Sequence, residues 1–181
     1  RLERDPNITV RYGSENRVVL ITLDQFNDNP QFVKVPGKEN VNPFKDKRVR
    51  QALYEAIDIN AIQRAVMRGK SVPTGTIVAQ SINGWTPELA KRYPYNPEHA
   101  KQLLAEAGYP DGFSFTIDTP NNRWINDEAI TKAVAAMWSK IGLDVSVNAM
   151  PRAQFFPKML SLNCSAYLVA WGINTFDALY G

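Results

Sequence analysis

The chain has 181 residues, of which 44% are hydrophobic and 22% charged, and this is enough for one domain with a substantial core. Its formal net charge is +3 and it contains no block of Lys or Arg, so the composition does not indicate nucleic-acid binding. No apolar run approaches the roughly 18 residues of a membrane helix, and the single cysteine, Cys164, excludes an internal disulfide.

Two strand-like segments open the chain. Residues 7–12 and 17–26 are separated by a Gly-Ser-Glu-Asn turn, and both are predicted to be strands. The following segment, 27–47, is rich in proline and asparagine, which resist regular structure. It is predicted to be a loop, and its length indicates a functional or surface role.

A helical region follows. The apolar positions of residues 45–57 share one face of a helix. Asp58 is expected to cap a second helix over 59–68, which ends near Gly69. Residues 71–95 contain several prolines and glycines and are predicted to be a loop.

The next helix has the clearest local signals. Asn96 is expected to be its cap and Pro97 its first residue, where the missing N–H costs nothing. Gly108 is expected to end it. Its apolar stripe consists of Ala100, Leu103, Leu104 and Ala107.

Strands and helices alternate in the second half of the chain. The predicted strands are 113–119, 143–150 and 166–171, and the predicted helices are 126–142 and 151–162. Pro157 is expected to kink or shorten the second of these helices. This order predicts a parallel βαβ arrangement, in which ligands lie beyond the carboxyl ends of the strands. The residues just after Thr119 and Trp171 are therefore the first candidates for a site.

Catalytic chemistry is not indicated. An enzyme needs a nucleophile, a base and a group that orients the base. The only histidine, His99, lies off the apolar stripe of its helix and is expected to be a solvated surface residue without a partner. Cys164 precedes an apolar strand and is expected to be a small core residue. With no Gly-rich phosphate loop and no metal-ligand spacing, the sequence predicts no catalytic residue, no cofactor and no metal.

Aromatic and polar residues near the predicted strand ends are the candidates for ligand binding. Trp124 and Trp171 could each pack a loop or form the wall of a pocket. Arg123 could pair with an anionic ligand group or remain a solvated loop residue. Asn174 and Asp177 could hydrogen bond to a ligand or stabilise the turn after the strand. Trp138, by contrast, lies on an apolar helix face and is expected in the core.

Three stretches together resemble one known family. They are "NPFKDKRVRQALYEAIDINAI", "YNPEHAKQLLAEAGYPDG", and "IGLDVSVNAMPRAQF" followed by "WGINTFDA". In order and spacing they resemble the family-5 extracellular solute-binding proteins of ABC importers, which include oligopeptide, dipeptide and nickel receptors. The resemblance extends from Leu20 to the end of the chain.

The resemblance implies an α/β fold, namely one lobe of a periplasmic-binding-protein type II fold with a mixed sheet and flanking helices. Such receptors are two-lobed clamps that close on a ligand. The whole chain, 1–181, is then a single lobe cut from a longer receptor, with leading strands in 1–26, a helical part in 43–109 and a βαβαβ part in 113–181. The absence of an initiator methionine and of a signal peptide fits this expectation.

The resemblance also implies a function. The expected ligand is a peptide or another small solute, the expected partner is an inner-membrane ABC permease, and the expected location is the periplasm, with the receptor either free or lipid-anchored. No enzyme activity, cofactor or nucleic acid is expected. The expected ligand-binding residues are Trp171, Gly172, Asn174, Asp177, Arg123 and Trp124. An enzyme or an interaction module that reuses the lobe remains the alternative.

One position departs from the family pattern. In the family's peptide receptors, an aspartate three residues after the pocket tryptophan holds the amino terminus of the peptide. Carried onto this chain, the tryptophan is Trp171 and the aspartate position is occupied by Asn174. An asparagine cannot form the charge-assisted bond that a carboxylate forms with an ammonium group. A modified peptide or a different solute is therefore an alternative ligand.

Overall fold

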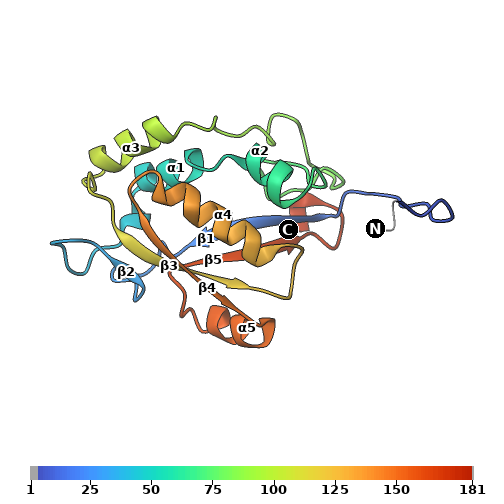
Figure 1. Cartoon of the computed structure of the whole chain (residues 1–181). Helices are drawn as coiled ribbons and strands as arrows, with labels where there is room; N and C mark the ends of the chain where they lie inside the picture. The colour runs from blue at the N-terminus through green and yellow to red at the C-terminus, as the bar shows by residue number, and fades with distance from the viewer. Residues whose placement is uncertain (1–3, 181) are drawn as a thin grey trace.

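A computed structural model describes residues 4–180 and has a five-stranded mixed sheet at its centre (Figure 1). The strands are β1 (Arg17–Leu23), β2 (Val33–Lys34), β3 (Ser114–Pro120), β4 (Asp144–Met150) and β5 (Ala166–Gly172). Strand β3 pairs in parallel with β4 and with β5, and antiparallel with the short β2. Strand β1 pairs antiparallel with β5 along its whole length. The predicted parallel βαβ arrangement of the second half is thus confirmed.

Helices lie on both faces of this sheet. They are η2 (Pro43–Lys45), α1 (Lys47–Glu55), α2 (Ile59–Ala61), the π-helical η3 (Ile62–Val66), α3 (Pro97–Glu106), α4 (Asp127–Ser139), α5 (Arg152–Leu160) and η4 (Ala178–Tyr180). Helices α1, α3 and α4 lie above the sheet in Figure 1, and α5 lies below it. Among the described residues, no helix is long and apolar enough to cross a membrane.

The main core lies between the sheet and the upper helices, and Trp138 of α4 is at its centre. Only 1% of Trp138 is exposed, and its ring centroid lies 5.5 Å from that of Phe115 on β3. Its indole Nε1 donates a hydrogen bond of 2.8 Å to the carbonyl of Leu53, in the last turn of α1. The last carbonyls of an α-helix have no N–H donor within the helix, and the Leu53 carbonyl is one of them. One side chain therefore joins β3, α4 and α1.

Local capping signals were predicted correctly. The Asp58 carboxylate accepts a hydrogen bond from the backbone N–H of Ala61, and the Asn96 side chain accepts one from His99. Gly108 follows α3 with a φ of +88°, a left-handed conformation that a side chain disfavours.

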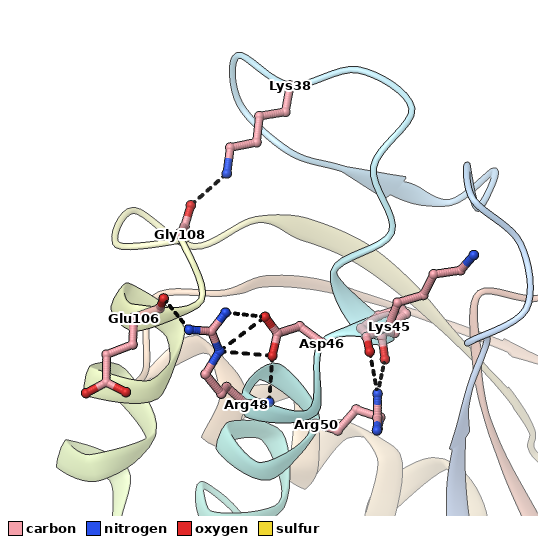
Figure 2. Close-up of polar contacts among 8 residues, drawn as sticks. Lys38, Lys45, Asp46, Arg48, Arg50, Glu106 and Gly108 are labelled. Carbon is pink, nitrogen blue, oxygen red and sulfur yellow. Dashed lines mark hydrogen bonds and ion pairs between the residues drawn. The ribbon is translucent and has the colours of Figure 1, made fainter.

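The C-terminal end of α3 is held by cations from preceding segments, as Figure 2 shows. The Arg48 guanidinium donates to the carbonyl of Glu106 and to the Asp46 carboxylate, and Lys38 Nζ donates to the carbonyl of Gly108. The Arg48 hydrogen bond holds the pKa of the Asp46 carboxyl below its usual value. Positive groups near the last carbonyls of a helix are favourable, so these contacts fix α3 beside α1.

Residues 7–12 form no strand, so this prediction was wrong. The segment extends away from the sheet (Figure 1), and apart from Val10 its residues are exposed. Among residues 4–180 no strand pairs with this segment, so its alternating pattern is not buried against the sheet. The next strand ends at Leu23 and not at Phe26, because the Asp24 carboxylate accepts hydrogen bonds from the N–H groups of Phe26 and Asn27 and forms a turn.

Pro157 does not end α5, which continues to Leu160. A proline removes the N–H that would bond to the carbonyl four residues earlier, here that of Ala153. Because Ala153 is exposed, water can bond to that carbonyl. The expected shortening at this proline is therefore not observed.

The Trp138 contact provides a test of this core. Trp138→Phe keeps an aromatic ring but removes the donor to the Leu53 carbonyl, so we expect the free energy of unfolding to fall by about 1–3 kcal/mol. Urea unfolding followed by circular dichroism measures it. Trp85→Phe, in a loop, is the control and should have a much smaller effect. Equal stability of the two variants would contradict the assigned role of Trp138.

Candidate functional site

The carboxyl ends of β3, β4 and β5 meet at one edge of the sheet because the three strands are parallel through β3. Helix α4 follows β3 on one face and α5 follows β4 on the other (Figure 1). The chain therefore leaves two neighbouring strands in opposite directions, which is the place where open α/β sheets bind ligands. The segments 121–127 and 171–178 lie at this edge.

The turn after β3 is fixed by Asp127, of which only 3% is exposed. Its carboxylate Oδ2 accepts hydrogen bonds from the backbone N–H groups of Arg123, at 3.0 Å, and Trp124, at 2.9 Å. Its Oδ1 accepts from the N–H of Glu128 at the start of α4. A carboxylate suits this position because it lies in the positive end of the helix dipole. The backbone that carries Arg123 and Trp124 is thus rigidly placed.

Trp124 packs against α5. Its ring centroid lies 6.4 Å from Phe155 and 6.1 Å from Phe156, both in edge-on geometry. Its indole Nε1 is buried and has no hydrogen-bond partner within residues 4–180. The Arg123 guanidinium lies 5.4 Å from the Trp124 ring centroid, at cation–π distance. The structure therefore shows Trp124 packing a loop against a helix.

The turns after β3 and β4 are joined directly. The N–H of Asn121 donates to the carbonyl of Met150, and the N–H of Arg152 donates to the Asn122 side chain at 2.8 Å. Asn122 thereby caps the first turn of α5, and the two turns form one unit at this edge.

Trp171 lies at the end of β5, opposite Val18 of β1, and 52% of it is exposed. Gly172 ends the strand. A Cβ atom on Gly172 would approach described atoms no closer than 3.5 Å, so packing does not require a glycine here. Asn174 is exposed, whereas Ile173, between Gly172 and Asn174, is only 2% exposed.

Asp177 is used by the turn itself. Its Oδ2 accepts a hydrogen bond of 3.2 Å from Asn83 Nδ2, and its Oδ1 accepts one of 3.0 Å from the N–H of Leu179. Asn83 lies in the loop 71–95, and sequence reasoning did not identify it. The two residues are too far apart in the chain for a local pattern to relate them.

The six predicted site residues thus form two groups. Arg123 and Trp124 lie at the end of β3, and Trp171, Gly172, Asn174 and Asp177 lie at the end of β5. No hydrogen bond or ring contact joins the two groups within the described part of the chain.

His99 has a partner, so its expected isolation was wrong. Its Nδ1 lies 2.6 Å from Glu55 Oε2, and Gln51 Nε2 donates to Glu55 Oε1 at 2.7 Å. The N–H of Asn96 also donates to the carbonyl of Glu55. These contacts join α3 to the end of α1, and the position of Glu55 could not be read from the local sequence around His99.

A third buried carboxylate, Asp118 on β3, anchors α5. Lys158 Nζ lies 2.8 Å from its Oδ2, and Asn148 Nδ2 donates to its Oδ1 at 2.7 Å. Cys164 lies beside this group and is 7% exposed, as expected of a core residue. Burial, followed by the charge of Asp118, raises the pKa of the Cys164 thiol to about 12. Residues 4–180 contain no group of three or more His, Cys, Asp or Glu side chains that could hold a metal ion.

The sequence matches the family model for bacterial extracellular solute-binding proteins, family 5 middle, over residues 1–181. It is 33% identical over 144 residues to heme-binding protein A of Haemophilus influenzae, a match that covers 75% of this chain and 25% of that protein. It is 29% identical over 132 residues to the dipeptide-binding protein of Escherichia coli, covering 71% and 24%. The chain thus spans about a quarter of the length of these relatives.

Solved structures show the same fold. A dipeptide-binding protein of a Pseudoalteromonas species in complex with Met-Leu has a TM-score of 0.70 and 26% identity, with 92% of this chain and 32% of that one covered. A periplasmic binding protein of Helicobacter pylori in complex with the peptide STSA has a TM-score of 0.69 at 22% identity, with 94% and 30% covered. These neighbours confirm the expected type II periplasmic-binding-protein fold.

The burial and protonation of the Cys164 thiol can be tested by alkylation. With its pKa at about 12, Cys164 is almost entirely protonated at pH 8, so we expect iodoacetamide to alkylate it only through unfolding. Because the folded-state pKa is raised above 9.0, the thiol stabilises the fold below that pH, and this contribution is lost as the pH rises towards 12. Mass spectrometry follows the labelling. Ser14→Cys in a Cys164→Ser background is the exposed control, and equal labelling rates would contradict the burial of Cys164.

Proposed function

The chain belongs to the family-5 bacterial extracellular solute-binding proteins, and from this membership we propose that it is one lobe of a receptor that captures a peptide-like solute for an ABC importer. The match of the family over residues 1–181 is the observation that carries the proposal. We infer a two-lobed receptor, with a periplasmic location and an inner-membrane permease as partner. The domain-closure mechanism of such clamps buries the ligand between the lobes.

In this proposal the end of β5 faces the ligand. Trp171 supplies a half-exposed apolar wall. Packing within the chain does not require a glycine at position 172, so we propose that Gly172 instead lets the ligand approach the backbone closely. Exposed Asn174 offers an amide to the solute. Arg123 and Trp124 line the adjacent mouth. Asp177, which is already bonded to Asn83 and Leu179, supports the turn and contributes to the ligand only through it.

Binding without chemistry is the reading that the described side chains support. The Cys164 thiol is buried and has a strongly raised pKa, and the charged groups beside it are Asp118 and Lys158. The side-chain partner of His99 is Glu55, so His99 is not placed as a base for this thiol. We therefore propose no enzyme activity, no cofactor and no nucleic-acid partner. A non-peptide solute is the second candidate, because one relative with 33% identity is named a heme-binding protein.

The two-lobed proposal predicts that half of the ligand contacts are missing from this chain alone. Calorimetry with Met-Leu, glutathione and hemin should detect binding by the full-length receptor that contains this chain. The 181-residue chain by itself should bind the same probes at least about 100-fold more weakly, because binding energy is spread over both lobes. Micromolar or tighter binding by the isolated chain would contradict the proposal of a shared site.

Asn174 predicts a weak preference for free-amine peptides. In the full-length receptor, Asn174→Asp should strengthen binding of Met-Leu roughly tenfold, since a carboxylate forms a charge-assisted bond with an ammonium group. N-acetylated Met-Leu should gain nothing. Thr175→Asp adds the same charge one residue away and is the matched control. An unchanged affinity for Met-Leu would mean that Asn174 does not contact the amino terminus.

A further inference from the structure

A turn from the loop 71–95 lies against the segment that follows β5. The green and red ribbons of these segments run side by side in Figure 1. The N–H of Asn83 donates to the carbonyl of Phe176, and the N–H of Ala178 donates to the carbonyl of Asn83, both at 3.0 Å. Asn83 and Asp177 form an isolated parallel bridge. The two segments are thus joined by backbone hydrogen bonds on both sides of one residue.

A small apolar cluster, separate from the main core, lies beneath these bonds. Its buried members are Ala79, Ile82 and Ile173, which are 6%, 3% and 2% exposed. Ile82 and Ile173 come from the two segments that the hydrogen bonds join. Burying isoleucine side chains away from water is favourable, so this cluster also holds the two segments together.

Gly84 permits the close approach. Its φ is +94°, and a Cβ atom there would lie 2.8 Å from the Cβ of Ala178, closer than carbon atoms can pack. Any other residue would have to adopt a strained left-handed backbone and also push Ala178 away. A glycine is therefore required at this contact for two independent reasons.

We propose that the turn 82–84 is a positioning element that holds the segment 173–178, beyond the end of β5, and thereby orients Asn174. The inference rests on the proposed function only in treating that segment as ligand-facing. Trp171 is already placed by its pairing with Val18 of β1, whereas Asn174 is exposed and its own side chain does little to fix it. The placement of Asn174 depends on the buried Ile173 before it and on the bonds of Phe176 and Ala178 to Asn83.

The first test needs no ligand. In the full-length receptor, Gly84→Ala should raise hydrogen exchange at the Ala178 amide at least about tenfold, because the contact that protects it is forced open. Gly142→Ala is the matched control. Gly142 has a φ of +93°, but a Cβ there meets nothing within 4 Å, so it shares the backbone strain without the clash. Equal exchange at Ala178 in the two variants would overturn the proposal.

A second variant covers the case in which Gly84→Ala does not fold. Ile82→Ala removes the apolar link but leaves the backbone unstrained. It should also raise exchange over 173–178, whereas Ile77→Ala, 51% exposed in the same loop, should not. The midpoint of global unfolding, measured on the same variants, distinguishes a residue that positions this segment from one that stabilises the whole fold. A purely structural residue would lower the midpoint and raise exchange everywhere, and that result would overturn the positioning role.

Ligand affinity completes the test. The Gly84→Ala receptor should bind Met-Leu or glutathione at least about fivefold more weakly than the Gly142→Ala receptor. Wild-type affinity in Gly84→Ala would overturn the positioning role and leave the proposed function intact. If the wild-type receptor binds neither these probes nor hemin, the proposed function fails for those solutes, and the exchange experiment alone decides whether the turn holds the segment.

Discussion

The hydrogen bond from the Trp138 indole to the Leu53 carbonyl is the contact on which the arrangement of the upper layer depends. It satisfies a carbonyl at the end of α1, and the indole that provides it also fills the space between α4 and β3. With α4 fixed in this way, Asp127 at its start is fixed too. The turn that carries Arg123 and Trp124 is then held by the Asp127 carboxylate.

The lower layer depends on charge. Asp118 is fully buried in β3, and an unpaired carboxylate there would cost several kcal/mol. Lys158 from α5 and Asn148 from β4 satisfy its two oxygens, so the helix is attached to the sheet at one defined point. Phe155 then contacts Tyr167 of β5, edge-on with the ring centroids 6.4 Å apart. The same helix therefore supports both groups of candidate residues, Trp124 directly and Trp171 through its strand.

The elements that sequence predicted well are those whose signals are local. Asn96 and Pro97 mark the start of α3 within two residues, and the alternation of 113–119 predicts the strand β3, which is in fact buried on both faces from Ile117 onward. The failures involve partners far away in the chain. Glu55 is 44 residues from His99, and Asn83 is 94 residues from Asp177. Local patterns cannot report such contacts, because they exist only once the chain has folded.

The shape of the loop 71–95 is also determined by contacts between residues that are distant in the chain. Its composition predicts irregular structure, yet tertiary contacts give it a defined shape. The Arg92 guanidinium stacks 4.2 Å from the Tyr54 ring centroid and donates to the carbonyl of Thr74, and burial lowers the pKa of Arg92. One part of the loop is thus attached to α1, while Asn83 is attached to the segment after β5. Because both attachments belong to one loop, residues 71–95 connect the end of α1 with the segment after β5 through defined contacts at each end.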